Sequence, residues 1–210
     1  MEKLLNHIYK VCRDPHSTGW GYSYLLQREN GNIFLPRMAK EATIHGELDA
    51  IAAAGGINSI YVTDFHFAGT GLQEVADRFG VDIQCSSLEV PKIRKRGLGN
   101  LAAFDFRRHH LADDWEVIPT PGHTTGGVCY LWTDANERYL FTGDFLYNAG
   151  KSWVVGSKKL EKVEQSLALI RSIDFTYLVG CGDDDLGLPY LQLTKSERHV
   201  FIDEIVNRFA

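Results

Sequence analysis

The chain lacks the sequence features of a membrane or secreted protein. No apolar run approaches the roughly 20 residues of a membrane-spanning helix, although 44% of the 210 residues are hydrophobic. The opening stretch, MEKLLNHIYKVCRD, carries charges too early and too often for a signal peptide. We therefore expect a cytoplasmic protein that does not associate with membranes.

Cysteine is scarce, and several common catalytic motifs are missing. The four cysteines are far apart and form no C-x-x-C pair, which favours structural thiols in a reducing compartment. They are Cys12, Cys85, Cys129 and Cys181. The chain has no G-x-S-x-G elbow and no P-loop. Gly97-Leu98-Gly99 is not preceded by a predicted strand, so a dinucleotide site is not expected.

Positive charge is also limited, since the formal net charge is -5. This balance argues against general nucleic-acid binding. One segment differs: residues 91–110 hold six positive charges and one negative charge, a local balance of +5. A solvated loop is the ordinary interpretation of such a run. The alternative is that it attracts a carboxylate or phosphate, so we expect a small, anionic substrate as partner and make no prediction of oligomeric state.

The first half of the chain alternates strand and helix patterns. Asn30-Gly31 is a strong hairpin signal, because that turn needs two residues that tolerate positive φ. Thr70 and Gln73 have capping-box spacing at the start of a helix, and Gly80 follows its last residue. The expected strands are 22–28, 32–35, 58–63 and 81–85, and the expected helices are 45–54 and 71–79.

The second half follows an irregular segment at 91–110. We expect strands at 115–119, 128–132, 139–142 and 175–179, a helix near 158–173, and a last helix that starts at Thr194 with Glu197 completing a capping box. Hairpins mixed with helices in both halves predict an α+β fold, a four-layer αβ/βα sandwich of two mixed β-sheets with helices outside. No linker or repeat is visible, so residues 1–210 are expected to form a single domain.

Polar side chains follow several predicted strands at glycine-containing turns. A Pro-Gly-His-Thr turn places His123 after one strand, and a Thr-Gly-Asp sequence places Asp144 after another. An imidazole and a carboxylate at strand tips are typical of half a metal site. A T-x-x-H-x-x-x-x-G stretch at 63–71 precedes a helix, and a Gly-Cys-Gly stretch at 180–182 follows a late strand.

This order of motifs resembles the metallo-β-lactamase superfamily, which includes the glyoxalase II-like hydrolases. The resemblance covers about residues 20–185. It implies the sandwich fold given above, a single metallo-β-lactamase-like domain and a metal-dependent hydrolase.

The first family motif, T-H-x-H-x-D-H-x-G, is degenerate here, because residues 63–71 read TDFHFAGTG. The comparison aligns His66 with the second histidine and puts Asp64 in place of the first. Ala68 and Gly69 replace the motif's aspartate and last histidine. The late histidine of the family is Cys181 here, and the early Asp-x-Gly turn is absent at residues 35–37.

The resemblance implies that one metal of the family pair retains its ligands. Its set becomes Asp64, His66 and His123 with Asp144 nearby, which is adequate for Zn²⁺, Fe²⁺ or Mn²⁺. The other metal keeps only Asp144 and Cys181, and two ligands seldom hold an ion. We therefore expect one Zn (or Fe or Mn) ion, or none, and no dinuclear centre.

Each candidate ligand also has an ordinary structural alternative. His66 would be a half-buried histidine bonded to a backbone carbonyl, and His123 would brace its turn. Asp144 would cap the loop after its strand. Cys181 would be a small buried thiol.

Two functional hypotheses follow. In the first, a metal ion lowers the pKa of a bound water toward about 7, and the hydroxide attacks an ester, thioester, lactone or phosphoester. Asp144 and Asp64 are then the catalytic candidates, with Asp144 orienting the water. In the second, the chain is a decayed family member that serves as a ligand- or partner-binding scaffold.

Overall fold

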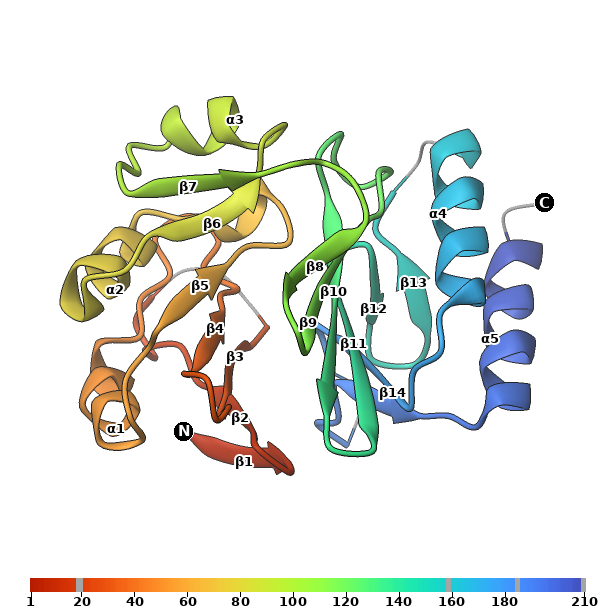
Figure 1. Cartoon of the computed structure of the whole chain (residues 1–210), viewed down its shortest axis with the longest axis horizontal. Coiled ribbons are helices and arrows are strands. Elements are labelled where there is room, and N and C mark those ends of the chain that lie inside the picture. Colours follow the sequence, from red (N-terminus) through yellow and green to blue (C-terminus); the bar gives the residue numbers. More distant parts are fainter. Residues whose placement is uncertain (18–20, 158–159, 184–185, 209–210) are drawn as a thin grey trace. The chain divides into compact units, whose positions relative to one another are not determined.

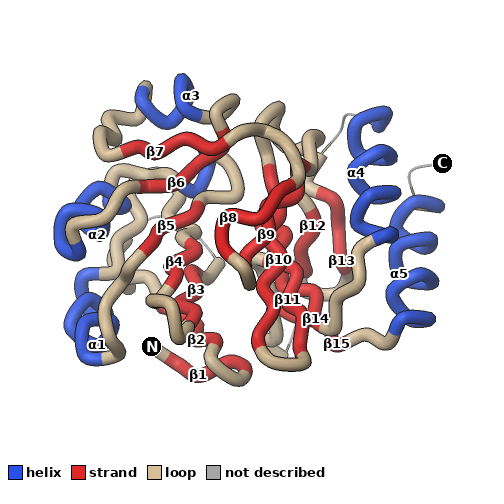
Figure 2. Tube along the Cα trace, viewed as in Figure 1, coloured by secondary structure: helices blue, strands red, loops and turns tan. Residues whose placement is uncertain are grey.

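The computed structural model describes residues 1–17, 21–157, 160–183 and 186–208. The chain folds as two compact units, Met1–Asp105 and Phe106–Ala210. Each unit contains one mixed β-sheet and its own helices (Figures 1 and 2).

The first unit is built on a seven-stranded sheet with its strands in sequence order. Strands β1 to β4 pair antiparallel, and β4 to β7 pair parallel. The parallel part makes the carboxyl ends of successive strands meet at one edge. The strands are β1 (Glu2–Leu5), β2 (Ile8–Val11), β3 (Ser23–Leu26), β4 (Ile33–Leu35), β5 (Ser59–Tyr61), β6 (Ile83–Ser86) and β7 (Leu101–Phe104).

Helices cover one face of this sheet. They are η1 (His45–Glu47), α1 (Leu48–Ala53), η2 (Phe65–Phe67), α2 (Gly71–Phe79) and α3 (Val90–Arg94). Ile51, Leu72 and Ile93 come from α1, α2 and α3 and lie in one buried cluster with Phe34 and Ile60 of the sheet. The apolar faces of these short helices therefore pack on the sheet and form the hydrophobic core of the first unit with it.

The second unit is built on a six-stranded sheet, in the order β15-β14-β11-β10-β9-β8. Only β11 and β14 pair in parallel, and the remaining neighbours are antiparallel. Its strands are β8 (His109–Ala112), β9 (Trp115–Pro119), β10 (Val128–Asp134), β11 (Glu137–Gly143), β14 (Tyr177–Gly180) and β15 (Tyr190–Gln192). A separate hairpin is formed by β12 (Leu146–Asn148) and β13 (Trp153–Val155).

Two longer helices, α4 (Leu160–Ser172) and α5 (Lys195–Asn207), complete this unit. Leu167 of α4 and Ile202 of α5 share a buried cluster with Leu131 and Leu140 of the sheet. A hydrogen-bonded ion pair between Arg171 and Asp203 joins the two helices. Within the described ranges, no helix is both long and apolar enough to cross a membrane.

Most of the predicted elements are confirmed. The Asn30-Gly31 turn joins β3 to β4, and α2 has its predicted bounds with Gly80 in the left-handed conformation at its end. The predicted capping box of α5 is present. The predicted helix near 158–173 is confirmed from residue 160, while residues 158 and 159 lie outside the described part of the chain.

Two local predictions were wrong. The capping box of α2 does not form. Thr70 is already helical and its hydroxyl donates to the Lys40 carbonyl, while the Gln73 side chain bonds Asp77 and the Gly99 amide. The segment 91–110 is not irregular, since it contains most of α3, all of β7 and the start of β8. Its strands are four residues each and mostly half-buried, without the alternation of buried and exposed positions by which strands are recognised.

The predicted fold class is confirmed: the protein is α+β, with two mixed β-sheets and helices packed on them. The assignment of residues 1–210 to a single domain stays a prediction.

Candidate metal-binding residues

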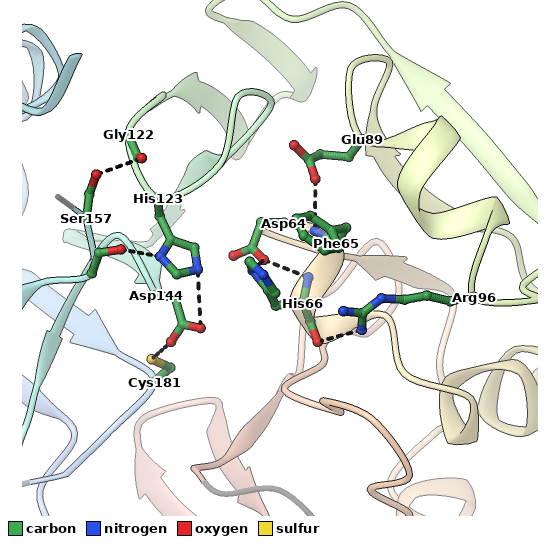
Figure 3. Close-up of polar contacts among 11 residues, drawn as sticks. Asp64, Phe65, His66, Glu89, Arg96, Gly122, His123, Asp144, Ser157 and Cys181 are labelled. Atoms are coloured by element: carbon green, nitrogen blue, oxygen red, sulfur yellow. Dashed lines mark hydrogen bonds and ion pairs between the residues drawn. The ribbon is translucent and has the colours of Figure 1, made fainter. Parts of the chain in front are cut away.

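In the first unit, Asp64 and His66 lie just past the carboxyl end of β5. Asp64 is extended (φ -163°), 3% exposed, and caps the short helix η2. Its Oδ1 accepts a hydrogen bond from the His66 amide at 2.8 Å and lies 3.0 Å from His66 Nδ1 (Figure 3). The carboxylate thus fixes the backbone and the imidazole of the second candidate ligand. Both of these contacts use Oδ1, so Oδ2 is the candidate oxygen for an ion.

A second set of contacts holds this turn from the side of α3. Glu89 is 1% exposed, and its carboxylate accepts a hydrogen bond from the Phe65 amide at 3.1 Å. Arg96 donates to the His66 carbonyl at 3.2 Å. These residues were not singled out from the sequence as site residues. The sequence offers little signal for them, because a lone acidic residue and a basic run are both common on surfaces.

The positions that replace two family ligands are closed by the backbone. Ala68 is fully buried and forms a parallel bridge with Met38. A Cβ on Gly69 would lie 2.0 Å from the Met38 carbonyl oxygen and 2.3 Å from the Lys40 carbonyl oxygen. The amides of Gly69 and Thr70 donate to these same two oxygens. A side chain therefore does not fit at position 69, and a second metal is not supported by this part of the chain.

In the second unit, strand order explains why three candidate residues gather at one edge. β11 and β14 run parallel with Gly143 paired to Gly180, so Asp144 and Cys181 follow equivalent strand ends. β9 lies beyond β10, and two antiparallel pairings make β9 run in the same direction as β11. The turn that carries His123 therefore leaves the sheet at the same edge.

The side chains of these three residues form a connected group. His123 Nδ1 is hydrogen bonded to the Gly156 carbonyl, and His123 Nε2 lies 3.7 Å from Asp144 Oδ2. The Cys181 thiol donates to Asp144 Oδ1 at 3.1 Å (Figure 3). When a histidine Nδ1–H donates to a carbonyl, the lone pair is on Nε2 and that nitrogen can coordinate an ion. An imidazole nitrogen, a carboxylate and a thiol in one group are chemically suited to Zn²⁺.

The turn around His123 is held by residues that the sequence did not reveal. Ser157 Oγ donates to the Gly122 carbonyl at 2.7 Å, and Ser166 Oγ donates to the Pro121 carbonyl at 2.8 Å. A Cβ on Gly156 would lie 2.0 Å from the Asp144 carbonyl oxygen. Gly156 is thus required by close approach of backbone, a constraint that needs the fold to be known.

The structural alternatives for the candidate ligands hold in part. His123 does brace its turn through Gly156, and Cys181 is a buried thiol at 3% exposure. The bond to Gly156 is made by His123 Nδ1 and not by Nε2, so bracing the turn is compatible with ion binding through Nε2. The burial of Cys181 is compatible with ion binding as well. Within the first unit Asp64 lies beside His66, and within the second unit His123 lies beside Asp144. That these residues share one ion stays a prediction.

Cys85 and Cys129 are buried thiols of low reactivity. Burial raises the pKa of the Cys85 thiol to about 11, with the Glu89 carboxylate contributing. Burial also raises the pKa of the Cys129 thiol to about 12. Thiols with such pKa values are poor nucleophiles near neutral pH. No disulfide joins any two of the four cysteines, all of which are among the described residues.

The chain matches the sequence profile of the metallo-beta-lactamase superfamily over residues 46–182. It therefore belongs to that superfamily. MEM-A1, a subclass B3 metallo-beta-lactamase isolated from a soil metagenome library, has a similar structure, with a TM-score of 0.67 at 17% identity over 98% of this chain and 92% of MEM-A1. At that identity the similarity shows the fold.

Curated relatives in this family are named as hydrolases. The chain is 34% identical over 97 residues to the probable polyketide biosynthesis zinc-dependent hydrolase BaeB of Bacillus velezensis, covering 45% of this chain and 41% of BaeB. It is 28% identical over 129 residues to a hydroxyacylglutathione hydrolase of Buchnera aphidicola, covering 61% of this chain and 48% of the relative. The chain thus spans about half the length of the curated relatives it matches.

Proposed function

We propose that this protein is a hydrolase that uses one metal ion, held by Asp64, His66 and His123 with Asp144 as a further ligand or as the group that orients water. The observation that carries the proposal is the pair of prepared half-sites. Each half-site fixes its donor groups by hydrogen bonds: Asp64 Oδ1 holds the His66 imidazole in one unit, and the Gly156 carbonyl holds the His123 imidazole with Nε2 toward Asp144 in the other.

The ion, when bound, would supply Lewis acidity that lowers the pKa of a water molecule and so makes hydroxide available as the nucleophile. The side chains of the protein do the rest. Asp64 orients His66 through Oδ1, and Gly156 orients His123 through its carbonyl. Asp144 lies beside His123 and can hold the attacking water or accept its proton. Zn²⁺ is proposed first, with Fe²⁺ or Mn²⁺ as the other ions that suit imidazole and carboxylate donors.

The proposed substrate is a small acyl or phosphoryl compound: an ester, thioester, lactone or phosphoester. Thioesters are the first class to test, because several relatives are named as hydroxyacylglutathione hydrolases. We propose a cytoplasmic location, consistent with four cysteines that form no disulfide.

The number of metal ions is proposed to be one. The second site of the family pair would need donors at positions 68 and 69. Ala68 is fully buried, and Gly69 faces two carbonyl oxygens. Cys181 is then either a further ligand of the single ion or a thiol that keeps Asp144 in place through its hydrogen bond.

Metal analysis of the purified chain tests the proposal. We expect about one equivalent of Zn, Fe or Mn, lost in His66→Ala and in His123→Ala. His45→Ala is the matched control, because His45 lies on the surface and pairs with Glu74. Hydrolysis of a thioester panel should follow the metal content across these variants. A folded protein that binds none of these ions, even after addition, would instead support the scaffold alternative.

A further inference from the structure

Two cations pack against the ring of Phe65, the residue between Asp64 and His66. Lys92 Nζ lies 4.5 Å from the ring centroid and the Arg96 guanidinium carbon lies 5.0 Å from it. The imidazole of His66 contacts the same ring, with centroids 3.9 Å apart. The two cations are therefore held beside one of the proposed metal ligands.

Neither cation forms a direct ion pair with a carboxylate of the described residues. Among the residues that the structure describes, no ion pair involves Lys92 or Arg96, and the Arg96 side chain donates a hydrogen bond to the His66 carbonyl. Glu89, the acidic residue of this region, directs its carboxylate to the Phe65 amide. Residues 89–96 contain four positive charges and one negative charge, a balance of +3 in a chain of net charge -5.

Lys92 of α3 and Arg96 of the turn after it lie on the same ring and repel each other, and an anion bound between them would relieve that repulsion. The aromatic ring restrains both side chains, which reduces the entropy that a ligand would otherwise have to offset. The Lys92 side chain is exposed and that of Arg96 is half-buried, so both can be reached from solvent. The guanidinium fork matches the planar oxygens of a carboxylate or a phosphate.

We propose that Lys92 and Arg96 form an oxyanion subsite that binds the carboxylate or phosphate group of the substrate. This inference rests on the proposed function, since it identifies the part of the substrate that is not cleaved. It also refines the interpretation of the basic segment 91–110, whose charges have separate roles: Arg108, for example, pairs with Glu116 through a 2.6 Å hydrogen bond. Only Lys92 and Arg96 are assigned to the subsite.

Titration of metal-free protein with inorganic phosphate and, separately, with acetate tests the subsite without requiring activity. We expect millimolar binding of at least one anion, weakened about tenfold by Lys92→Gln and by Arg96→Gln, which corresponds to ~1.4 kcal/mol each. Lys95→Gln is the matched control, because Lys95 is exposed on the same segment and contacts neither Phe65 nor His66 in the described contacts. Arg96→Lys should restore acetate binding less well than phosphate binding, since it keeps the charge but loses the fork.

Comparing the two anions shows which charged group, a phosphate or a carboxylate, the substrate carries. Phosphate-selective binding assigns a phosphorylated substrate, and comparable or tighter binding of acetate assigns a carboxylate. The Lys92 side chain makes no hydrogen bond to the described residues, and its backbone amide bond to the Glu89 carbonyl does not depend on the side chain. Lys92→Gln therefore keeps the test valid even when Arg96→Gln lowers stability. Binding that is equal in the wild type, Lys92→Gln and Lys95→Gln overturns the subsite.

Kinetics then separates this inference from the proposed function. A pair of thioesters that differ only by a carboxylate or its methylamide should show a preference for the charged compound that Lys92→Gln reduces about tenfold. Hydrolysis without that preference refutes the subsite alone. Anion binding that depends on Lys92 in a protein with no hydrolytic activity refutes the hydrolase proposal and leaves the subsite standing.

Discussion

Substituting Gly69 by alanine tests whether the second metal position of the family is closed by backbone. The added Cβ would lie 2.0 Å from the Met38 carbonyl oxygen and 2.3 Å from that of Lys40. Both contacts are well inside van der Waals distance, so the segment 38–40 has to move away by about 1 Å or more. That movement breaks the hydrogen bonds from the Gly69 amide at 2.7 Å and from the Thr70 amide at 2.9 Å.

The expected cost can be built from these two bonds. A typical hydrogen bond contributes about 1 kcal/mol net, and leaving a buried donor unsatisfied costs about 1–3 kcal/mol. Gly69→Ala should therefore lower the free energy of unfolding by about 2–4 kcal/mol, at the large end for a single substitution. With a urea m-value of about 2–3 kcal/mol/M, the midpoint of unfolding falls by roughly 1 M.

Urea denaturation followed by far-ultraviolet circular dichroism measures this effect. Gly99→Ala is the matched control, because the nearest atom to its Cβ is Gln73 Oε1 at 3.9 Å, and it should change stability by less than about 0.5 kcal/mol. Equal stabilities of the two variants would refute the reasoning. As a functional extension, the double variant Ala68→Asp, Gly69→His should not acquire a second equivalent of metal.

Three further predictions concern other parts of the chain. Iodoacetamide at pH 8 should leave Cys85 and Cys129 unlabelled in the native protein, because burial raises the pKa of both thiols, and mass spectrometry after digestion checks this. Thr194→Ala removes the cap of α5 and should lower stability by about 1 kcal/mol in thermal unfolding, whereas Thr133→Ala should not. The hydrogen bond from Arg198 holds the pKa of Asp174 below its usual range. The ion pair between Arg198 and Asp174 therefore stabilises the fold fully above the ordinary carboxyl pKa of about 4, and this stabilisation is lost as the pH falls through the lowered pKa of Asp174. Arg198→Met should be less stable than the wild type at pH 7, and the difference in the free energy of unfolding should narrow on acidification. A difference that does not change with pH would contradict this.

Much of the fold could be predicted because local signals and tertiary packing agree. The α2 helix shows this best, since its apolar stripe, its length and the glycine after it all give the same bounds. The hairpin at Asn30-Gly31 is a second case. The segment 91–110 could not be predicted, because β7 is defined by pairing with β6 rather than by its own alternation. Long-range pairing of this kind leaves little trace in a single sequence.

The candidate site divides in the same way. His66, His123 and Asp144 carry motif signals in the sequence, and each lies at a strand end in the structure. Gly156 and Glu89 carry none. Their roles depend on which atoms approach them: the Asp144 carbonyl beside Gly156, and the Phe65 amide beside the Glu89 carboxylate. Residues that position ligands are therefore recognised only once the chain is folded.

The carboxylate at position 64 has a consequence for the acidity of the proposed centre. Two imidazoles are neutral, while Asp64 and Asp144 each bring one negative charge, so the four side chains neutralise a divalent ion. A centre with three histidines keeps its positive charge and brings the pKa of its water to about 7. A neutral centre withdraws less electron density, and its water ionises at higher pH. The rate of this protein should accordingly keep rising into the alkaline range, where a three-histidine enzyme has already levelled off.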